Sequence, residues 1–563
     1  MSGLFSLLGT GARSLMASQL AQATTGNNAA NSTTPGFSRR RTNLAEGPTV
    51  RLTGGIFGTG VQAVDVTRLR DRILDVQRRL DGQELAFSKA QSGVLQQVEA
   101  LFAPADSNAL ATGLNRLFAA FGDLAAHPTD PAVRQALVAE AQNFVNAIHS
   151  TRDAVVRTES GVYDTVADRV VDLNTTTAAL AAVNAKVVTA QPDPSLQDEQ
   201  DRLVDHLSSL IGVRATMQSD GTVQVVVDGS GIQLVDGPRA TTVTMAGVPT
   251  SGTVSLSAGG ATLPAVRGEI GGLLDMRNNA TTGLPATLAS LDSFAVELIQ
   301  AINTVHASGT GLTLPQTVTG SVTVATPAAN LSTDGLRPPP ASGTIQFGVF
   351  DATGAMVSTS TLAVNPATTS LNALAAAISG LPNLTAAVVG GQLQISTTNP
   401  ANQLAFGPDS TGLLAGLGVN GFLAGTDAAS IAVSADVLGS ANRIAAGQAD
   451  LTAGVVSAGD NRNARALAAL ATQRSLLAGT QTPSQMLGGI GTAVGNTTRS
   501  ATARTDAQQA LVDADEARLQ ATSGVNLDEE MADMVRFQHA YEASARYIRT
   551  IDEMIQSLMG ILR

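Results

Sequence analysis

Apolar side chains recur in steps of four and three residues along the last stretch of the chain, from Asn526 to Leu562. A seam of this kind, sustained for about five heptads, is typical of a coiled coil. Asn526 is a good N-cap and Glu529 follows three residues later, a pattern that predicts where the helix begins. The seam consists of Leu527, Met531, Met534, Gln538, Tyr541, Ala545, Ile548, Asp552, Ile555, Met559 and Leu562.

Some apolar residues of this stretch lie off the seam, namely Phe537, Ile551, Met554 and Leu558. One partner helix would therefore not cover every apolar side chain, and we expect the helix to pack on more than one neighbour. The alternative is an amphipathic helix that closes the core of its own domain.

The first residues of the chain outline a second, weaker helix with one apolar face. Short isolated helices are costly to nucleate, so this one needs a partner. We expect the two chain ends to form an antiparallel pair that is loose in the monomer and orders in an assembly. The face consists of Leu4, Phe5, Leu8, Ala12, Leu15 and Gln19. Gly26, Asn27, Asn28 and Asn31 then favour an end to the helix, and Pro35-Gly36 favours a turn.

The pattern between these ends changes period several times. Helical spacing predicts helices from about 70 to 211, with a break near Gly82 and restarts after Pro131 and near residue 160. Alternation around Asp220-Gly221 and Asp228-Gly229 predicts a small antiparallel β-meander over 213–267. A helix follows over 284–305, and from about 440 the chain is helical again, with a break at 483–495.

A compositional shift to Thr, Ser, Val, Gly and Pro marks 313–435 as an inserted β-rich domain with a strand–strand–helix–strand–strand order. The fold class expected is multidomain and mainly α, with terminal helices pairing as a coiled coil. We expect a terminal domain at 1–40 plus 523–563, a helical domain at 41–312 plus 436–522, and the insert at 313–435.

Length and composition narrow the class of protein. A chain of 563 residues has room for about three to five domains. The net charge of −12 argues against a general nucleic-acid binder. The absence of cysteine excludes disulfides and thiolate metal sites. No cleavable signal peptide and no window of about 18 apolar residues is present, so we expect neither a signal-directed route nor membrane insertion.

Candidate chemistry is sparse. Gly416-Leu-Gly-Val-Asn-Gly421 has dinucleotide-loop spacing, but its flanks do not form a βαβ unit, so chance explains it better. The five histidines, His127, His149, His206, His306 and His539, show no metal-ligand spacing. We expect no catalytic residue, cofactor or metal. Arg39–Arg41 would contact acidic lipid or a partner's carboxylates, or lie in a solvated turn, and both alternatives stay open.

Both chain ends resemble known flagellar motifs. The run Thr25-Gly-Asn-Asn-Ala-Ala-Asn-Ser-Thr-Thr-Pro-Gly-Phe-Ser-Arg39 is similar to the motif shared by rod, hook and hook-associated proteins of the bacterial flagellum, with Ala29 and Phe37 in place of the usual Ile and Tyr. Ser523-Gly-Val-Asn-Leu-Asp-Glu-Glu530 and Gly459-Asp-Asn-Arg-Asn463 resemble the hook-associated protein 1 family of hook–filament junction proteins.

This resemblance implies a structural subunit that self-assembles helically and contacts hook protein on one side and the second hook-associated protein on the other. It also implies type III export from the cytoplasm to the extracellular flagellum, and a chaperone on the C-terminal helix. The alternatives are another axial protein, such as a hook or filament subunit, and a secreted surface adhesin or hydrolase. The expected assembly interface is Leu4, Phe5, Leu8, Leu15, Asn27, Asn28, Asn31, Pro35, Gly36, Leu527, Met531, Met534, Phe537, Tyr541, Ile548, Ile551, Ile555 and Leu558.

Overall fold

The computed structural model describes residues 2–34, 36–52, 55–102, 109–189, 193–264 and 266–561. Contacts divide the chain into two compact units. The first comprises 1–93, 162–275 and 500–563, and the second comprises 94–161 and 276–499. This division follows contact density and differs from the expected terminal, helical and inserted domains, whose boundaries stay predictions.

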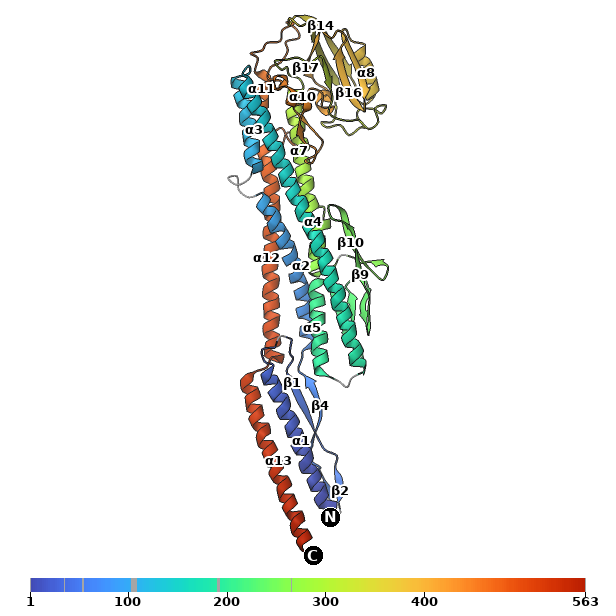
Figure 1. Ribbon diagram of the computed structural model, residues 1–563, viewed down its shortest axis with the longest axis vertical. Helices are drawn as coiled ribbons and strands as arrows, with labels where there is room; N and C mark the ends of the chain where they lie inside the picture. The colour runs from blue at the N-terminus through green and yellow to red at the C-terminus, as the bar shows by residue number, and fades with distance from the viewer. Residues whose placement is uncertain are drawn as a thin grey trace. The chain divides into compact units, whose positions relative to one another are not determined.

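The two chain ends form paired helices in the first unit. Helix α1 spans Ser2–Ala30 and α13 spans Leu527–Ile561. They lie side by side with both termini at the same end of the pair (Figure 1). A Cβ placed on Gly11 would meet Ile548, and one placed on Gly26 would meet Met534. Rising numbers on α1 thus match falling numbers on α13, and the predicted antiparallel pair is confirmed.

The side of α13 that is less exposed differs in part from the predicted seam. Phe537 and Ile551 lie on it, whereas Gln538 and Asp552 are exposed. The less exposed residues are Glu530, Asp533, Met534, Phe537, Tyr541, Ser544, Ala545, Ile548, Ile551 and Ile555. The spacing of four and three residues is as predicted, but Glu530, Phe537 and Ile551 take the places predicted for Met531, Gln538 and Asp552. The polar breaks at Gln538 and Asp552 disappear once the displaced positions are used.

Helix α1 is longer than the sequence predicted. It continues through Gly26, Asn27 and Asn28, which we had expected to end it. Asn28 is only 2% exposed, and its side-chain amide donates to the carbonyl of Arg40, 2.8 Å away. The tertiary hydrogen bonds of Asn28 compensate for its weak helix propensity, so the helix ends only at the turn that follows Ala30.

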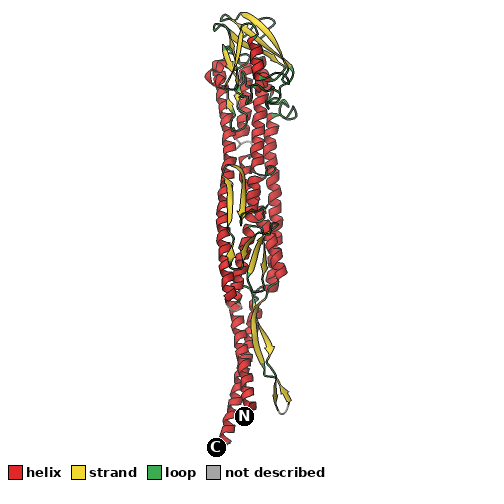
Figure 2. Ribbon diagram, turned by 90° about the vertical axis from the view of Figure 1, so that its right-hand side faces the viewer, coloured by secondary structure: helices red, strands yellow, loops and turns green. Residues whose placement is uncertain are grey.

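A β-hairpin covers part of α1. Strand β1 (Arg40–Glu46) pairs antiparallel with β4 (Val61–Arg68), and β2 (Val50–Leu52) pairs with β3 (Gly55–Phe57). The hairpin runs beside the terminal helices (Figure 2), and the hydroxyls of Thr42 and Thr24 join it to α1 at 2.9 Å. The sequence analysis had not predicted these strands.

Long helices carry the remainder of the first unit. These are α2 (Arg72–Leu101), α4 (Pro131–Thr189), α5 (Pro194–Leu210), α6 (Gly268–Asn278) and α12 (Pro483–Ser523), of which all but α5 also contribute residues to the second unit. The predicted breaks near Gly82, near residue 160 and at 483–495 are wrong. A glycine weakens a helix by about 1 kcal/mol, which tertiary packing overrides.

The β-meander predicted over 213–267 is confirmed as two antiparallel sheets. In the first sheet the strand order is β5 (Val213–Met217), β6 (Val223–Val227), β7 (Gln233–Asp236) and β8 (Arg239–Ala240). In the second sheet it is β11 (Ala261–Thr262), β10 (Ser251–Ala258) and β9 (Val243–Val248). Asparagines on α4 hold both sheets. Asn174 exchanges two hydrogen bonds with Val243, and Asn184 donates to the carbonyls of Val223 and Gly237.

The second unit contains helices α3 (Ala109–Ala126) and α7 (Leu284–His306) and the β-rich insert. The order β13 (Gly343–Phe350), β14 (Met356–Val364), α8 (Leu371–Ser379), β15 (Leu384–Val389) and β16 (Gln392–Thr397) confirms the predicted strand–strand–helix–strand–strand module. Strands β12 (Thr317–Thr319) and β17 (Gln403–Asp409) complete two three-stranded sheets, β12-β16-β15 and β14-β13-β17.

Short elements follow the insert. They are α9 (Leu413–Gly416), β18 (Leu423–Ala424), β19 (Ala432–Val433), α10 (Ala435–Gly439), a 3-10 turn (Ala441–Arg443) and α11 (Arg462–Ala469). The Gly-Asp-Asn-Arg-Asn motif at 459–463 lies at the start of α11 and makes internal contacts. Asn461 donates to the carbonyl of Ala125 and Asn463 to that of Ala445. Asn463 is 1% exposed, so this motif holds the unit together internally.

A buried histidine stabilises the same unit. His306 Nδ1 lies 2.8 Å from the carbonyl oxygen of Asn420, and its Nε2 accepts from the amide of Ala445 at 2.9 Å. Because Nε2 accepts, the ring is neutral. Burial is the main cause that lowers the pKa of His306 from 6.5 to about 4.

The folded state therefore binds fewer protons at His306 than the unfolded state does, and this contribution to stability is lost as pH falls from 6.5 to about 4. We expect about 3 kcal/mol of unfolding free energy to be lost in that interval. Urea unfolding at a series of pH values measures it. His306→Gln should be less stable at neutral pH and should lack the loss of unfolding free energy that His306 causes between pH 6.5 and about 4. His539→Gln, which changes an exposed residue of α13, should match the parent, and an identical pH profile in His306→Gln would contradict the assignment.

Candidate assembly interface

A buried polar cluster joins the two chain ends. The Nε of Arg39 donates to Oε1 of Glu530 at 2.6 Å, and the Nδ2 of Asn28 donates to Oε2 of the same carboxylate at 3.0 Å. A second nitrogen of Arg39 pairs with Glu529 at 3.0 Å. Glu530 is 2% exposed, so both of its oxygens are desolvated and both are satisfied.

This cluster explains the acidic start of α13. The Oδ1 of Asn526 accepts from the amide of Asp528 at 3.0 Å, as the predicted N-cap should. Glu529 and Glu530, however, bind Arg39. Burial lowers the pKa of Arg39, but the ion pairs with Glu530 and Glu529 outweigh it, so the pKa of this guanidinium lies above its ordinary value.

A second set of ion pairs connects the hairpin and α2 to α5. Asp198, Asp201 and Asp205 lie three and four residues apart, so they share one face of α5. Asp198 pairs with Arg40 and Arg68, Asp201 with Arg68, Arg70 and Arg79, and Asp205 with Arg78 and Arg79. We call these three aspartates and five arginines the arginine–aspartate ladder.

Asp201 is the centre of the ladder. It lies 2.7 Å from a nitrogen of Arg68, 2.7 Å from one of Arg70 and 3.0 Å from one of Arg79. Burial raises the pKa of Asp201, but the surrounding guanidinium groups outweigh it and the pKa lies below its ordinary value. The polar cluster and the ladder together answer the open question about the arginines at 39–41 in part, because Arg39 and Arg40 bind carboxylates of their own chain.

Apolar side chains remain exposed on the outer faces of the terminal helices. Phe5 is 62% and Met16 is 66% exposed on α1, and Met531 is 53% and Met559 is 59% exposed on α13. The full set also includes Leu7, Leu20, Leu527, Val535, Tyr547, Met554, Leu558 and Ile561. A set of this extent on one pair of helices is typical of a surface that another protein covers.

The expected interface residues divide into three groups. The outer group is exposed and consists of Phe5, Asn27, Gly36, Leu527, Met531 and Leu558. The inner group is buried or half-buried and consists of Leu8, Leu15, Asn28, Asn31, Met534, Phe537, Tyr541, Ile548, Ile551 and Ile555. Pro35 and the side chain of Leu4 lie outside the described residues. The outer group is the exposed part of this set, and its role in contacts with a neighbouring molecule stays a prediction.

The sequence analysis missed Glu530 and the ladder as parts of this site. A signal was available, because Asp198, Asp201 and Asp205 have one-face helical spacing and the chain concentrates its arginines at 39–41, 68–72 and 78–79. The pairing between these groups was not visible, since it joins segments more than 120 residues apart in the chain, as with Arg79 and Asp201 at a separation of 122.

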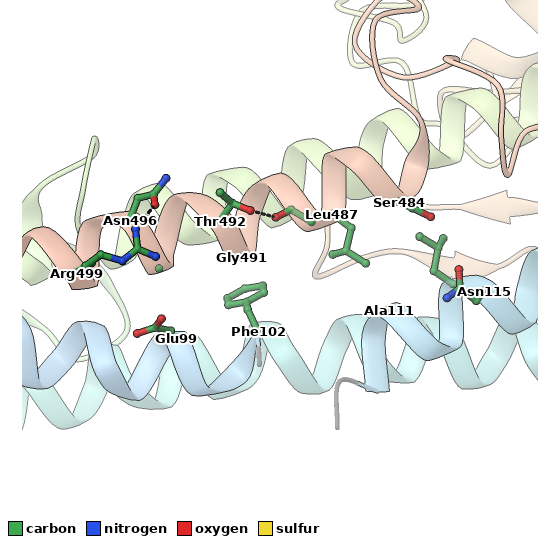
Figure 3. Close-up of a pocket in the computed structure, with 13 residues that line it drawn as sticks. Glu99, Phe102, Ala111, Asn115, Ser484, Leu487, Gly491, Thr492, Asn496 and Arg499 are labelled. Carbon is green, nitrogen blue, oxygen red and sulfur yellow. Dashed lines mark hydrogen bonds between the residues drawn. The ribbon is translucent and has the colours of Figure 1, made fainter. Parts of the chain in front are cut away.

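A cavity of about 480 Å³ in the second unit offers no comparable chemistry. Phe102 points toward Gly491 of α12, and Arg499 donates to Asn496 at 2.8 Å (Figure 3). The residues that line it include one carboxylate, Glu99, and neither histidine nor cysteine. These side chains do not form an acid–base or nucleophile–base pair.

No group of three or more His, Cys, Asp or Glu side chains is placed to hold a metal ion in the described part of the chain. Across the same residues, no helix is both long enough and apolar enough to cross a membrane.

Comparisons with known proteins identify the class. Residues 95–320 match the family model of the flagellar hook-associated protein FlgK helical domain, and residues 519–561 match that of the flagellar basal body rod FlgEFG protein C-terminal region. The second match covers α13, whose start completes the polar cluster. These two segments are therefore similar to parts of flagellar proteins that the family models describe.

Within that class the chain is similar over its whole length to flagellar hook-associated protein 1. The Bacillus subtilis protein is 24% identical over 602 residues, covering 100% of this chain and 99% of the relative. The Escherichia coli protein is 25% identical over 582 residues, covering 99% and 100%. These matches confirm the resemblance to the hook-associated protein 1 family.

A solved structure supports the fold. The flagellar hook junction protein FlgK from Burkholderia pseudomallei superposes with a TM-score of 0.52 at 18% identity, covering 80% of this chain and 100% of that one. The multidomain, mainly helical class with terminal helices and small sheets is thus confirmed.

Removal of the carboxylate at the centre of the ladder should destabilise the first unit. Asp201→Asn leaves Arg68, Arg70 and Arg79 without that charge, and we expect a loss on the order of 2 kcal/mol in urea unfolding. Added salt should reduce the difference in unfolding free energy between the parent and Asp201→Asn, because it screens the ion pairs. Because the pKa of Asp201 is depressed, the contribution is present above the ordinary pKa of 3.8 and is lost as pH falls below it. Asp164→Asn, an exposed site on α4, is the control, and equal stability of both variants would refute the role of the ladder.

Proposed function

We propose that this chain is a structural subunit of the bacterial flagellum that joins hook to filament by helical self-assembly, without bond chemistry. The observation that carries this proposal is the row of exposed apolar side chains on α1 and α13. The similarity to flagellar hook-associated protein 1 along the whole chain supports the proposed location in the flagellum. The neighbours would be copies of the same chain, hook protein on one side and the second hook-associated protein on the other.

The three expected domains have separate roles in this proposal. Residues 1–40 with 523–563 form the inner wall of the tube, and 41–312 with 436–522 form a helical layer around it. The insert at 313–435 faces outward. The insert is almost free of charge, with Asp334, Arg337, Asp351, Asp409 and Asp427 as its charged residues, so its surface would approach neighbouring copies without strong repulsion.

Export completes the proposal. A chain without cysteine and with almost no charge in its first 38 residues suits passage as an unfolded polypeptide through the flagellar type III channel, with the N-terminus as signal. Before export, a cytoplasmic chaperone would cover the exposed apolar face of α13, since that face is otherwise prone to aggregate.

One alternative stays within the same class. The model matched by residues 519–561 is named for rod proteins, so another axial position, such as hook or filament subunit, shares the end of the chain. The match of 95–320 to the FlgK helical domain favours the junction. Immunogold labelling of intact flagella distinguishes the two, because a junction protein would label one short band between hook and filament. Label along the whole hook or filament would reject the junction.

The exposed faces can be tested with charge substitutions. Met16→Glu and Met531→Glu would each place an unpaired carboxylate in a buried subunit contact, and we expect incorporation onto purified hooks to fall by more than about tenfold. Both residues are exposed in the free chain, so the melting temperature should change by less than about 2 °C. Electron microscopy of hooks incubated with each variant measures incorporation.

Val171→Glu is the matched control, because Val171 is 66% exposed but lies on α4. We expect it to incorporate as the parent does. Normal incorporation of both Met variants would show that these faces are not the subunit contact.

A further inference from the structure

The contact between α1 and α13 has few features that distinguish one axial alignment of the helices from another. Most of the buried residues of α1 are small, and the half-buried Leu8 and Leu15 lie one heptad apart, while α13 presents an apolar residue at the same heptad position four times, as Met534, Tyr541, Ile548 and Ile555. The small buried residues of α1 are Gly11, Ala17, Ser18, Ala21, Thr24 and Thr25, of which Thr24 contacts Thr42 of the hairpin. Such surfaces pack closely, but a displacement of one heptad, about 10.5 Å along the axis, would restore nearly the same contact.

The hydroxyl groups of α1 do not determine the alignment. Thr24 and Thr25 donate to carbonyls of their own helix, those of Leu20 and Ala21. In the described parts of the two helices, the bond from Asn28 to Glu530 is the only hydrogen bond that passes from α1 to α13. The apolar contact therefore holds the two helices together without fixing their axial alignment. That alignment depends on the hydrogen bond between Asn28 and Glu530, at one end of the pair.

We propose that Glu530, held by Asn28 and Arg39, is a positioning residue that sets the axial register of the terminal helix pair. A displacement by one heptad in either direction would separate the carboxylate from both partners. Glu530 is 2% exposed, and a buried charge that loses its partner is strongly destabilising. Selection of register is the best-attested role of single buried polar groups in helix pairs.

The consequence for assembly rests on the proposed function. The exposed residues Phe5 and Met16 belong to α1, and Met531 belongs to α13. A change of register would move these side chains relative to one another by about two helical turns. A neighbouring copy that contacts both helices would then meet a different surface.

The absence of cysteine makes the register measurable by disulfide formation. A Cβ on Gly11 would lie 2.7 Å from Cγ1 of Ile548, so Gly11→Cys with Ile548→Cys forms the native-register pair once the isoleucine is removed. Gly11→Cys with Tyr541→Cys and Gly11→Cys with Ile555→Cys report displacement by one heptad in either direction. Mild oxidation of the full-length monomer, followed by mass mapping, gives the yield of each pair.

With Glu530 present, the disulfide yield of the native-register cysteine pair should exceed that of either displaced pair by at least tenfold. This ratio corresponds to about 1.4 kcal/mol. Glu530→Ala should reduce this ratio to about one and raise the absolute yield of the displaced pairs. Glu530→Gln keeps an acceptor for Asn28 but loses the ion pair with Arg39, so an intermediate ratio is expected. Arg39→Gln removes the same ion pair from the other side and should match Glu530→Gln.

Glu542→Gln is the control, because Glu542 is an exposed carboxylate on α13, and its ratio should equal that of the parent. Two results would overturn the proposal. If Glu530→Ala lowers all disulfide yields together, the cluster stabilises the pair without selecting its register. If the ratio is unchanged in Glu530→Ala, the short connection at 524–526 sets the register.

This test is independent of the proposed function because it uses the monomer alone. Failure of the parent to incorporate onto hooks would reject the junction function and leave the register result intact. Conversely, if Glu530→Ala loses register selectivity but still incorporates normally onto hooks, the proposed link between helix register and assembly is rejected.

Discussion

The ion pair between Arg39 and the buried carboxylate of Glu530 is the interaction on which the organisation of the chain ends depends. It joins residues 491 positions apart in the chain, so it forms only when both ends of the polypeptide are present and folded together. Asn28 satisfies the second carboxylate oxygen and at the same time accepts from the amide of Arg40, which ties α1 to the first residue of the hairpin. One buried carboxylate thereby links α1, α13 and β1.

The arginine–aspartate ladder extends this connection through the first unit. Arg40 follows Arg39 directly and pairs with Asp198 on α5, so adjacent arginines attach the turn to two different helices. The ladder is partly buried and contains more guanidinium groups than its three α5 carboxylates can pair singly, so Asp198, Asp201 and Asp205 each serve at least two partners. Shared partners of this kind make the contributions of single residues non-additive.

Several elements could be predicted from the sequence because their signals are local. The helical spacing at 527–561, the Asp-Gly hairpins near 220 and 228, and the module at 343–397 each depend on residues a few positions apart. The errors have a common cause. Gly82, residue 160 and the glycines after Pro483 lie inside continuous helices because neighbouring helices compensate for their weak local propensity. The hairpin at 40–68 was not predicted from the sequence, because its strands have little hydrophobic alternation and are stabilised by α1.

The sequence by itself determined that the chain ends are helical, that they carry flagellar axial motifs, and that cysteine chemistry is absent. Residue identity and short-range spacing are sufficient for each of these conclusions. Only the tertiary structure decided which apolar residues of α13 face α1 and which remain exposed. A heptad seam and its neighbour one residue away are nearly equivalent in hydrophobic spacing, so the choice between Gln538 and Phe537 depends on the partner surface. That surface belongs to α1, at the other end of the chain, so no local pattern encodes the choice.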